Sequence, residues 1–496
     1  MAETLVMNED QSQALAKVNC FFEDPGQDVF ILCGSAGTGK TTLLSCVLEM
    51  AISSGLRPLL LAPTGRAVRI ARLKVERSLS ETPEVVKVST IHGSIFYLAD
   101  ITFDESAEAE GLPLVSMYFA LKQNAGDFDV VVVDEASMIG NGSSNDGDTR
   151  YGSGQLLNDL MRYLGLDRPK EERSRRVKLM FVGDMAQLPP VRGSESPALS
   201  LEFLQSQYDI RVQRYELTTV VRQTEGGDVL NLAYEARQRI SAPEIKPIAD
   251  SFGGQVYVSN FRQAAIDIVS GINQGKSVMA VVRTNAQVSR YNMTVRRYLW
   301  GRHCMNIMQG DTLLVVKNNP LLDLPNGELV QVVGANLKQQ RERLVGHNGC
   351  EVQLNFRGIT IEISNADGGT EFRPILVLEN LLYNNRTNLS QAERWALVEL
   401  VHKRHRYISK ESEAFKALLA TDPFYNALQV KFGYALTCHK AQGGEWSHVI
   451  VDLEGKPLMT QNDWRWFYTA VTRSKEALSL VNLSACNWVE ANQRAS

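Results

Sequence analysis

The sequence predicts an α/β protein with two domains, each built on a parallel sheet. Apolar strand candidates alternate with helical patterns over roughly the first 200 residues, and a second set of strand candidates follows from residue 278 onward. This alternation favours parallel sheets with a ligand site at the carboxyl ends of the strands. Residues 304–427 have a different sequence pattern, in which the strand candidates are short and look antiparallel. They predict a small β-barrel-like insertion with a helix.

Each predicted element has its own sequence signal. The strands of the first domain are apolar runs at Val29–Cys33, Leu59–Leu61, Val130–Val133 and Leu179–Val182. Those of the second domain are at Val278–Val282, Val449–Leu453 and Leu478–Leu483. The insertion has candidates at Thr312–Val316, Leu329–Val333, Val352–Ile363 and Ile375–Leu378, with a turn signal at Asn326-Gly327. A capping box at Ser390 and Glu393 predicts a helix that runs to about Ile408.

The composition is that of an ordinary soluble globular protein of two to four domains, with 496 residues, 44% hydrophobic and 22% charged. No apolar run approaches the roughly 20 residues of a membrane span, and the N-terminus lacks the pattern of a signal peptide. The seven cysteines are scattered without a C-x-x-C pair, which predicts a reducing cytoplasm, no disulfides and no structural zinc. The net charge of −4 gives no global sign of nucleic-acid binding, but a local basic groove is compatible with it.

Residues 34–42, with the sequence GSAGTGKTT, form the most informative pattern in the chain. They follow a strand candidate and precede a helical pattern, which is the context in which G-x-x-x-x-G-K-[ST] cradles phosphate. Lys40 would reach the β- and γ-phosphates and Thr41 would bind Mg²⁺. The alternative is a glycine turn that only connects strand to helix. We predict nucleotide contacts from Gly34, Ser35, Ala36, Gly37, Thr38, Gly39, Lys40, Thr41 and Thr42.

Two acidic residues, Asp134 and Glu135, come directly after the strand candidate Val130–Val133. A carboxylate at a strand end beside the phosphate loop can hold Mg²⁺, and a second one can orient and deprotonate the attacking water. We therefore assign Asp134 to the metal and Glu135 to catalysis, the alternative being a solvated loop. Gln187, in GDMAQLPPV at another strand end, is predicted to hydrogen-bond the γ-phosphate or the water, in a turn that two prolines also stiffen.

Eight motifs in one order resemble those of superfamily 1 helicases. They are GSAGTGKT, APTGRA, STIH, DEAS, GDMAQLPPV, VVRQ, TCHKAQG and YTAVTR. The Q-L-P-P-V form of the fifth motif is similar to the RecD-like and phage Dda-like 5′→3′ branch. The resemblance spans Gln11 to about Leu483, although residues 304–427 match only in position and general character.

The resemblance implies two RecA-like motor domains that use ATP and Mg²⁺, with a β-hairpin insertion in the first and an SH3-like β-barrel insertion in the second. The implied bounds are 1–96 and 122–194 for motor domain 1A, 97–121 for hairpin 1B, 195–303 and 428–496 for motor domain 2A, and 304–427 for insertion 2B. It also implies that Gln11 reads adenine and that Arg222 and Arg473 reach the γ-phosphate from the second motor. Guanidinium groups suit the charge that spreads over the γ-phosphate oxygens, so closure of the motors would be linked to hydrolysis.

A nucleic-acid groove is predicted from hydroxyl, amide, imidazole and cationic groups in the motifs. Such groups position phosphates without reading the base sequence. Arg66 and Lys440 would add a salt-dependent attraction, and Pro63 and His92 offer flat faces to bases. The alternative for His92 is a structural role. The predicted contacts are Pro63, Thr64, Arg66, Thr90, His92, Asn285, Thr437, His439 and Lys440.

Two further segments bear on how a duplex is separated. The resemblance places a duplex-splitting β-hairpin between Tyr97 and Leu121, with strand candidates at 101–103 and 114–119. Its acidic turn, residues 104–110, is an awkward fit because carboxylates repel phosphates, so the tip residue stays open. The basic cluster at 402–406 either complements the end of a helix or contacts DNA.

These patterns lead to the expectation of an ATP-dependent DNA helicase and single-stranded DNA translocase, with 5′→3′ direction implied by the resemblance. The expected substrates are single-stranded DNA and duplex–single-strand junctions. We expect a monomeric cytoplasmic motor without a membrane contact, and a nuclease, single-strand-binding or replication protein stays open as a partner. The alternatives are an ATP-gated motor subunit of a nuclease or repair complex and, less favoured, an RNA helicase.

Overall fold

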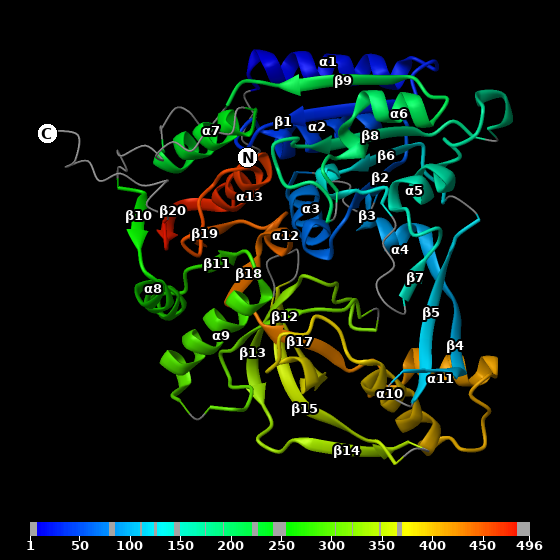
Figure 1. The fold of residues 1–496 in the computed structure, drawn as a ribbon. Coiled ribbons are helices and arrows are strands. Elements are labelled where there is room, and N and C mark those ends of the chain that lie inside the picture. Colours follow the sequence, from blue (N-terminus) through cyan, green and yellow to red (C-terminus); the bar gives the residue numbers. More distant parts are fainter. Residues whose placement is uncertain are drawn as a thin grey trace, which may run out of the picture.

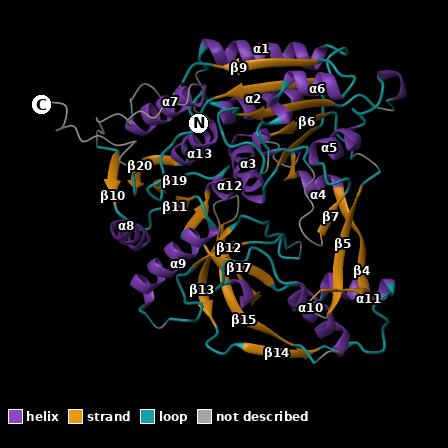
Figure 2. Ribbon diagram, viewed as in Figure 1, coloured by secondary structure: helices purple, strands orange, loops and turns teal. Residues whose placement is uncertain are grey.

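The computed structural model shows two parallel sheets side by side and a third, mostly antiparallel sheet beside both (Figures 1 and 2). The residues that it describes are 7–78, 85–109, 112–123, 126–142, 149–173, 175–191, 193–220, 227–241, 254–302, 304–319, 321–346, 349–364 and 370–483.

The first sheet has six parallel strands in the order β3-β2-β6-β8-β1-β9. Its strands are β1 (Val29–Gly34), β2 (Pro58–Ala62), β3 (Lys87–Thr90), β6 (Val130–Val133), β8 (Lys178–Gly183) and β9 (Val212–Leu217). The helices around it are α1 (Glu9–Glu23), α2 (Lys40–Ser53), α3 (Gly65–Ser78), α4 (Ile91–Ile95), α5 (Leu156–Leu164) and α6 (Leu201–Gln207). The central strands β1 and β6 are buried along their whole length, because helices cover both faces of the sheet.

One predicted boundary is wrong, because β9 belongs to this first sheet. The prediction ended the first motor at residue 194, but Val29 to Gly34 pair in register with Val212 to Leu217. An edge strand whose partner is far away in the sequence cannot be assigned to its sheet from the local sequence pattern. The first sheet therefore extends to Leu217.

The second sheet has five parallel strands in the order β10-β20-β19-β11-β18. They are β10 (Val256–Ser259), β11 (Val278–Val282), β18 (Ala435–Thr437), β19 (Trp446–Asp452) and β20 (Ser474–Val481). Its helices are α7 (Asp228–Ser241), α8 (Phe261–Asn273), α9 (Asn285–Trp300), α12 (Cys438–Ala441) and α13 (Gln461–Val471). The expected α/β class with two parallel sheets is confirmed.

The third sheet closes on itself. Strand pairs link β13, β12, β17, β16 and β15, and β15 pairs again with β13, so five strands form a ring with β14 outside it. The bounds are β12 (Thr312–Val315), β13 (Leu329–Ala335), β14 (Gln340–Val345), β15 (Glu351–Ser364), β16 (Thr370–Leu378) and β17 (Leu428–Phe432). A ring removes the open sheet edges that a small flat sheet would expose. Its SH3-like character stays a prediction.

Three details of the insertion differ from expectation. Strand β17 was assigned to the second motor but completes the ring, and it pairs with β16 in parallel rather than antiparallel fashion. Helix α10 (Gln391–Arg404) begins at the predicted capping box but ends before residue 408, and a second helix, α11 (Glu413–Thr421), follows it. The ring therefore takes its last strand from beyond both helices.

The predicted hairpin is present and packs against the insertion. Strands β4 (Phe96–Ala109) and β5 (Leu112–Leu121) pair antiparallel, and the short strand β7 (Thr149–Tyr151) adds to β5. Lys416 of α11 forms a 2.8 Å ion pair with Asp100 of β4, and Figure 1 shows the hairpin beside α10 and α11. The prediction of an acidic turn at residues 104–110 is wrong for 104–109, because these residues pair with β5 as part of β4. Their side chains, and residue 110, lie outside the described part. The hairpin is therefore braced at its side.

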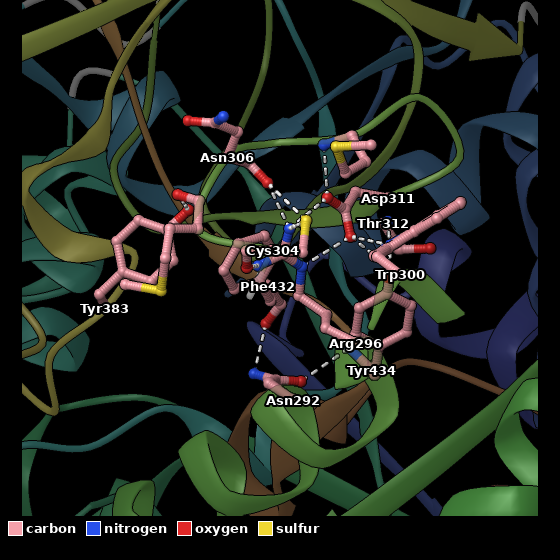
Figure 3. A network of polar contacts seen from close by, with 12 residues as sticks. Asn292, Arg296, Trp300, Cys304, Asn306, Asp311, Thr312, Tyr383, Phe432 and Tyr434 are labelled. Atoms are coloured by element: carbon pink, nitrogen blue, oxygen red, sulfur yellow. Dashed lines mark hydrogen bonds and ion pairs between the residues drawn. The ribbon is translucent and has the colours of Figure 1, made fainter. Parts of the chain in front are cut away.

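A buried ion pair attaches the ring to the second motor (Figure 3). Arg296 of α9 and Asp311, beside β12, are almost fully buried and joined by two hydrogen bonds of 3.0 Å. Tyr434 also donates to Asp311 at 2.7 Å, and the Arg296 guanidinium lies 3.8 Å from the centre of the Phe432 ring. One helix thereby holds strands that are far apart in sequence.

Replacing Asp311 with asparagine is expected to lower the free energy of unfolding by about 3–5 kcal/mol, because a buried guanidinium loses its charged partner. Urea unfolding followed by circular dichroism measures this loss. The control is Asp127→Asn, which removes a carboxylate that is 81% exposed in its pair with Arg57, and its expected cost is below about 1 kcal/mol. Equal small losses in the two variants would contradict a role for the buried pair in stability.

Candidate active site between the two parallel sheets

A cavity of about 910 Å³ lies where the first sheet meets the second. Its walls come from the phosphate loop, the acidic pair and Gln187 on one side, and from α7, the segment after α12 and the segment after α13 on the other. The predicted residues that line it are Gln11, Ser35, Ala36, Gly37, Gly39, Lys40, Thr41, Thr42, Asp134, Glu135, Gln187 and Arg473. Residues that are far apart in the sequence are therefore brought to one site.

The phosphate loop has the backbone shape that its glycines predict. Gly37 and Gly39 have φ angles of 83° and 81°, a left-handed conformation that side chains with a Cβ rarely adopt. Lys40 Nζ donates to the carbonyl oxygens of Gly34 and Ser35 at 2.7 and 2.9 Å. The ammonium group is thus held over the loop, at the N-terminus of α2, where an anion is favoured.

Gln11 joins the first helix to the phosphate loop. Its Oε1 accepts from Asn8 N, and its Nε2 donates to the carbonyl of Thr38 at 3.1 Å. The side chain is buried and lines the cavity. Recognition of adenine by Gln11 stays a prediction, which this position at the cavity wall supports.

The acidic pair lies at the end of β6 in an unusual conformation. Asp134 Oδ1 accepts from Glu135 N at 2.8 Å, and Glu135 itself has φ 51°, in the left-handed region. Such backbone strain in a non-glycine residue is typical of functional sites. Burial raises the pKa of Asp134, and burial together with the neighbouring Asp134 charge raises the pKa of Glu135. Two crowded carboxylates favour a cation beside them.

Arg473 enters the cavity from the second sheet. It follows α13, and its Nε donates to the carbonyl of Thr469 at 3.0 Å. It is 6% exposed, and its positive charge opposes, without reversing, the rise that burial and Asp134 cause in the pKa of Glu135. The other predicted arginine, Arg222, lies outside the described residues.

Gln187 is buried in a segment that contacts the second motor directly. Its Oε1 is a buried acceptor without a protein partner, which leaves it available to a ligand or water. The adjacent Leu188 donates its N–H to Thr469 Oγ1 at 2.9 Å and accepts from Gln442 Nε2 at 3.2 Å. Sequence reasoning missed Tyr468, Thr469 and Gln442, although all three lie inside the YTAVTR and TCHKAQG motifs.

The predicted nucleic-acid residues are at the carboxyl ends of strands in both parallel sheets. Pro63 and Thr64 follow β2, Thr90 ends β3, Asn285 follows β11 and Thr437 ends β18. Asn285 is exposed, and the other four are partly exposed. Strands β3 and β18 are edge strands, and Figure 1 shows both beside the ring. The two sheets and the ring thus border one region.

A second cavity, of about 460 Å³, lies in that region. Thr90 and α3 line one wall, and the segment between β12 and β13 lines the other. Arg69 of α3 forms an ion pair with Glu328 across this cavity. Gly65 lies so close to Pro325 that a Cβ at position 65 would collide with it. The ring therefore contacts the first sheet next to the predicted groove.

Four predicted nucleic-acid residues are more enclosed than the sequence suggests. The Arg66 guanidinium packs on Trp446, 4.2 Å from its ring centre, at the contact between the sheets. The His92 ring packs edge to face on Tyr151 at 4.9 Å, and burial lowers its pKa to about 4. This packing favours a structural role for His92, the alternative to contact with bases. Burial also lowers the pKa of His439 and of Lys440.

Two features are absent from the described part of the chain. None of its helices has both the length and the apolar composition for a membrane span. It also contains no cluster of three or more His, Cys, Asp or Glu side chains that could hold a metal ion.

Family comparisons match both parallel sheets. Residues 21–145 match the AAA domain family, and residues 432–481 match the UvrD-like helicase C-terminal domain family. The first match contains the phosphate loop and the acidic pair, and the second contains Arg473.

Longer similarities cover nearly the whole chain at low identity. An uncharacterized protein of Acanthamoeba polyphaga mimivirus is 20% identical over 96% of this chain and all of that protein. The ATP-dependent RecD2 DNA helicase of Deinococcus radiodurans is 23% identical over 98% of this chain but 51% of that protein, so this chain spans about half of its length. The crystal structure of a Bacteroides Pif1 helicase with ADP-AlF3 and ssDNA is 16% identical, covering 99% and 96% of the two chains, with a TM-score of 0.47.

Proposed function

We propose that the chain is a superfamily 1 helicase of the RecD-like type. We propose further that it uses ATP and Mg²⁺ to move along single-stranded DNA and separate duplexes. The observation that carries the proposal is the 910 Å³ cavity, whose lining joins the phosphate loop and acidic pair of one motor to Arg473 of the other. A site built from two motors makes hydrolysis depend on how they close.

The residues of the first motor would bind the nucleotide and prepare the water. Lys40 would hold the β- and γ-phosphates, and Thr41 with Asp134 would hold Mg²⁺. The cation would supply charge neutralisation on the phosphates. Glu135 would accept the proton of the attacking water, and Gln187, with its unpartnered buried oxygen, would orient that water.

The second motor would contribute charge to the same step. Arg473, and by resemblance Arg222, would stabilise the γ-phosphate oxygens as negative charge develops on them. Because Arg473 is held by its own helix, it moves with the second motor. Opening and closing of the cavity would then accompany each hydrolysis cycle.

The DNA strand would run across the carboxyl ends of both parallel sheets, past the ring. Thr64, Thr90, Asn285 and Thr437 occupy that side, and they would hold phosphates rather than base edges. The hairpin, braced by α11, would meet the junction between duplex and single strand. We propose 5′→3′ movement by a monomer, with motor 1A, hairpin 1B, motor 2A and insertion 2B as its parts.

Two other activities fit the same motor. In a nuclease or repair complex, it would serve as an ATP-gated subunit that needs a partner protein. As an RNA helicase, it would displace RNA strands through the same phosphate contacts, because these do not read the bases. The purified chain tested on both polymers separates these alternatives.

Strand displacement from tailed duplexes tests the proposal. Purified protein with ATP and Mg²⁺ is expected to unwind DNA with a 5′ single-stranded tail, and to leave 3′-tailed and blunt DNA duplexes and RNA duplexes paired. Fluorescence of a labelled displaced strand measures this. Unwinding only after a partner is added would support the complex subunit, and displacement of RNA alone would overturn the choice of DNA.

A further inference from the structure

We propose that Tyr468 is a positioning residue that links the phosphate loop to the placement of Arg473. The inference rests on the proposed function, since it concerns how the second motor reads the nucleotide site. Tyr468 lies on α13 of the second motor, is 1% exposed and contacts the first motor at two catalytic segments.

The phenol group bridges two segments of the first motor. Its Oη accepts the backbone N–H of Ala36, in the phosphate loop, at 2.9 Å. The same hydroxyl donates to Asp184 Oδ2 at 2.6 Å. Asp184 lies three residues before Gln187, so a single oxygen atom touches both the loop that binds phosphate and the segment predicted to orient the water. Burial beside Asp184 raises the pKa of Tyr468 well above its ordinary value, so the phenol keeps the proton that it donates.

The next residue on the helix continues this contact to Arg473. Thr469 Oγ1 accepts from the N–H of Leu188, and the Thr469 carbonyl accepts from Arg473 Nε. Gln442 holds the other side of the same Leu188 backbone. The chain of contacts therefore runs from the phosphate loop through α13 to the guanidinium group that faces the cavity.

A helix transmits such a contact because it is stiff over a few residues. Tyr468 lies three residues before the last residue of α13, Val471, and Arg473 lies two residues beyond it, tied back to the helix by its bond to the Thr469 carbonyl. Any nucleotide-dependent movement of the Ala36 N–H or of Asp184 changes the bonds of the phenol, which fix the position of this end of α13. The position of Arg473 changes with it. Tyr468 need not touch the nucleotide for this.

The alternative is that Tyr468 only fills space in the core. Tyr468→Phe separates the two roles, because it keeps the ring and removes the hydroxyl. Loss of the hydrogen bond from the phenol to a buried carboxylate would misplace Arg473 in the transition state. We therefore expect the DNA-stimulated kcat to fall by about 10- to 100-fold. The KM for ATP should change less than the DNA-stimulated kcat, because the phenol does not itself touch the nucleotide. The tightening of DNA binding by a non-hydrolysable ATP analogue should also be lost.

The matched control is Tyr291→Phe. Tyr291 is fully buried in the second motor and donates to a buried carboxylate, Asp452, at 2.9 Å, but does not reach the first motor. It should lose thermal stability about as much as Tyr468→Phe while keeping DNA stimulation. Asp184→Asn combined with Tyr468→Phe should lower stimulation no further than the stronger single variant, because both variants disturb the same Tyr468–Asp184 bond.

The measurements are ATPase rate against ATP concentration with and without oligo-dT, anisotropy of labelled oligo-dT with and without the analogue, and melting temperature. Wild-type stimulation retained in Tyr468→Phe would overturn the inference, as would an equal loss of stimulation in Tyr291→Phe. If the wild-type protein itself shows no DNA-stimulated hydrolysis, the proposed function fails instead.

Discussion

Replacing Glu135 with glutamine is expected to lower ATP turnover by on the order of 10²–10⁴, because the water loses its general base. Nucleotide affinity should persist, since the phosphate loop and Asp134 remain. The φ of 51° places this carboxylate in a strained turn at the end of β6, beside the cavity. Strain at that position is compatible with a side chain held for chemistry rather than for stability.

Turnover at saturating ATP and equilibrium binding of a fluorescent ATP analogue are the measurements. The exposed Glu411, in the insertion, provides the control variant Glu411→Gln, which should behave as wild type. Glu135→Gln also removes one of two crowded charges, so its melting temperature should not fall. Retained turnover together with a large loss of affinity would assign Glu135 to binding instead.

Replacing Lys40 with alanine is expected to reduce hydrolysis by at least about 10²–10³, because the ammonium group stabilises charge on the transferred phosphate. Unlike Glu135→Gln, this variant should also bind ATP more weakly. In the structure Lys40 Nζ bridges the carbonyls of Gly34 and Ser35. A phosphate oxygen between the loop N–H groups would compete for that ammonium group.

Phosphate release gives the rate, and circular dichroism checks that the fold persists. The control is Lys17→Ala, an exposed lysine on α1. Because all DNA-dependent movement in the proposed function needs hydrolysis, Lys40→Ala should also fail to unwind 5′-tailed duplexes. Near-normal turnover with an unchanged spectrum would remove the phosphate-loop assignment.

The nucleotide half of the site is readable from the sequence because its signals are local. The phosphate loop needs three glycines and a Lys-Thr pair within nine consecutive positions between a strand and a helix, and the acidic pair needs only the end of β6. Apolar runs likewise predict the central strands of both parallel sheets, which are buried on both faces. The capping box predicts the start of α10 for the same reason.

Only the tertiary structure decides which distant segments pair with one another. Strand β9 joins the first sheet and β17 closes the ring because of partners far away in the sequence, so local patterns place both in the wrong domain. The sequence predicts that His92 offers a flat face to bases, but its ring packs against Tyr151 and burial lowers its pKa to about 4. The Ala36–Tyr468 bond joins residues 432 positions apart. The types of residue along the chain determine which groups can bind a nucleotide. The packing of the two motors determines which of these groups meet at one site. That packing depends on contacts between distant surfaces, which no local sequence pattern encodes.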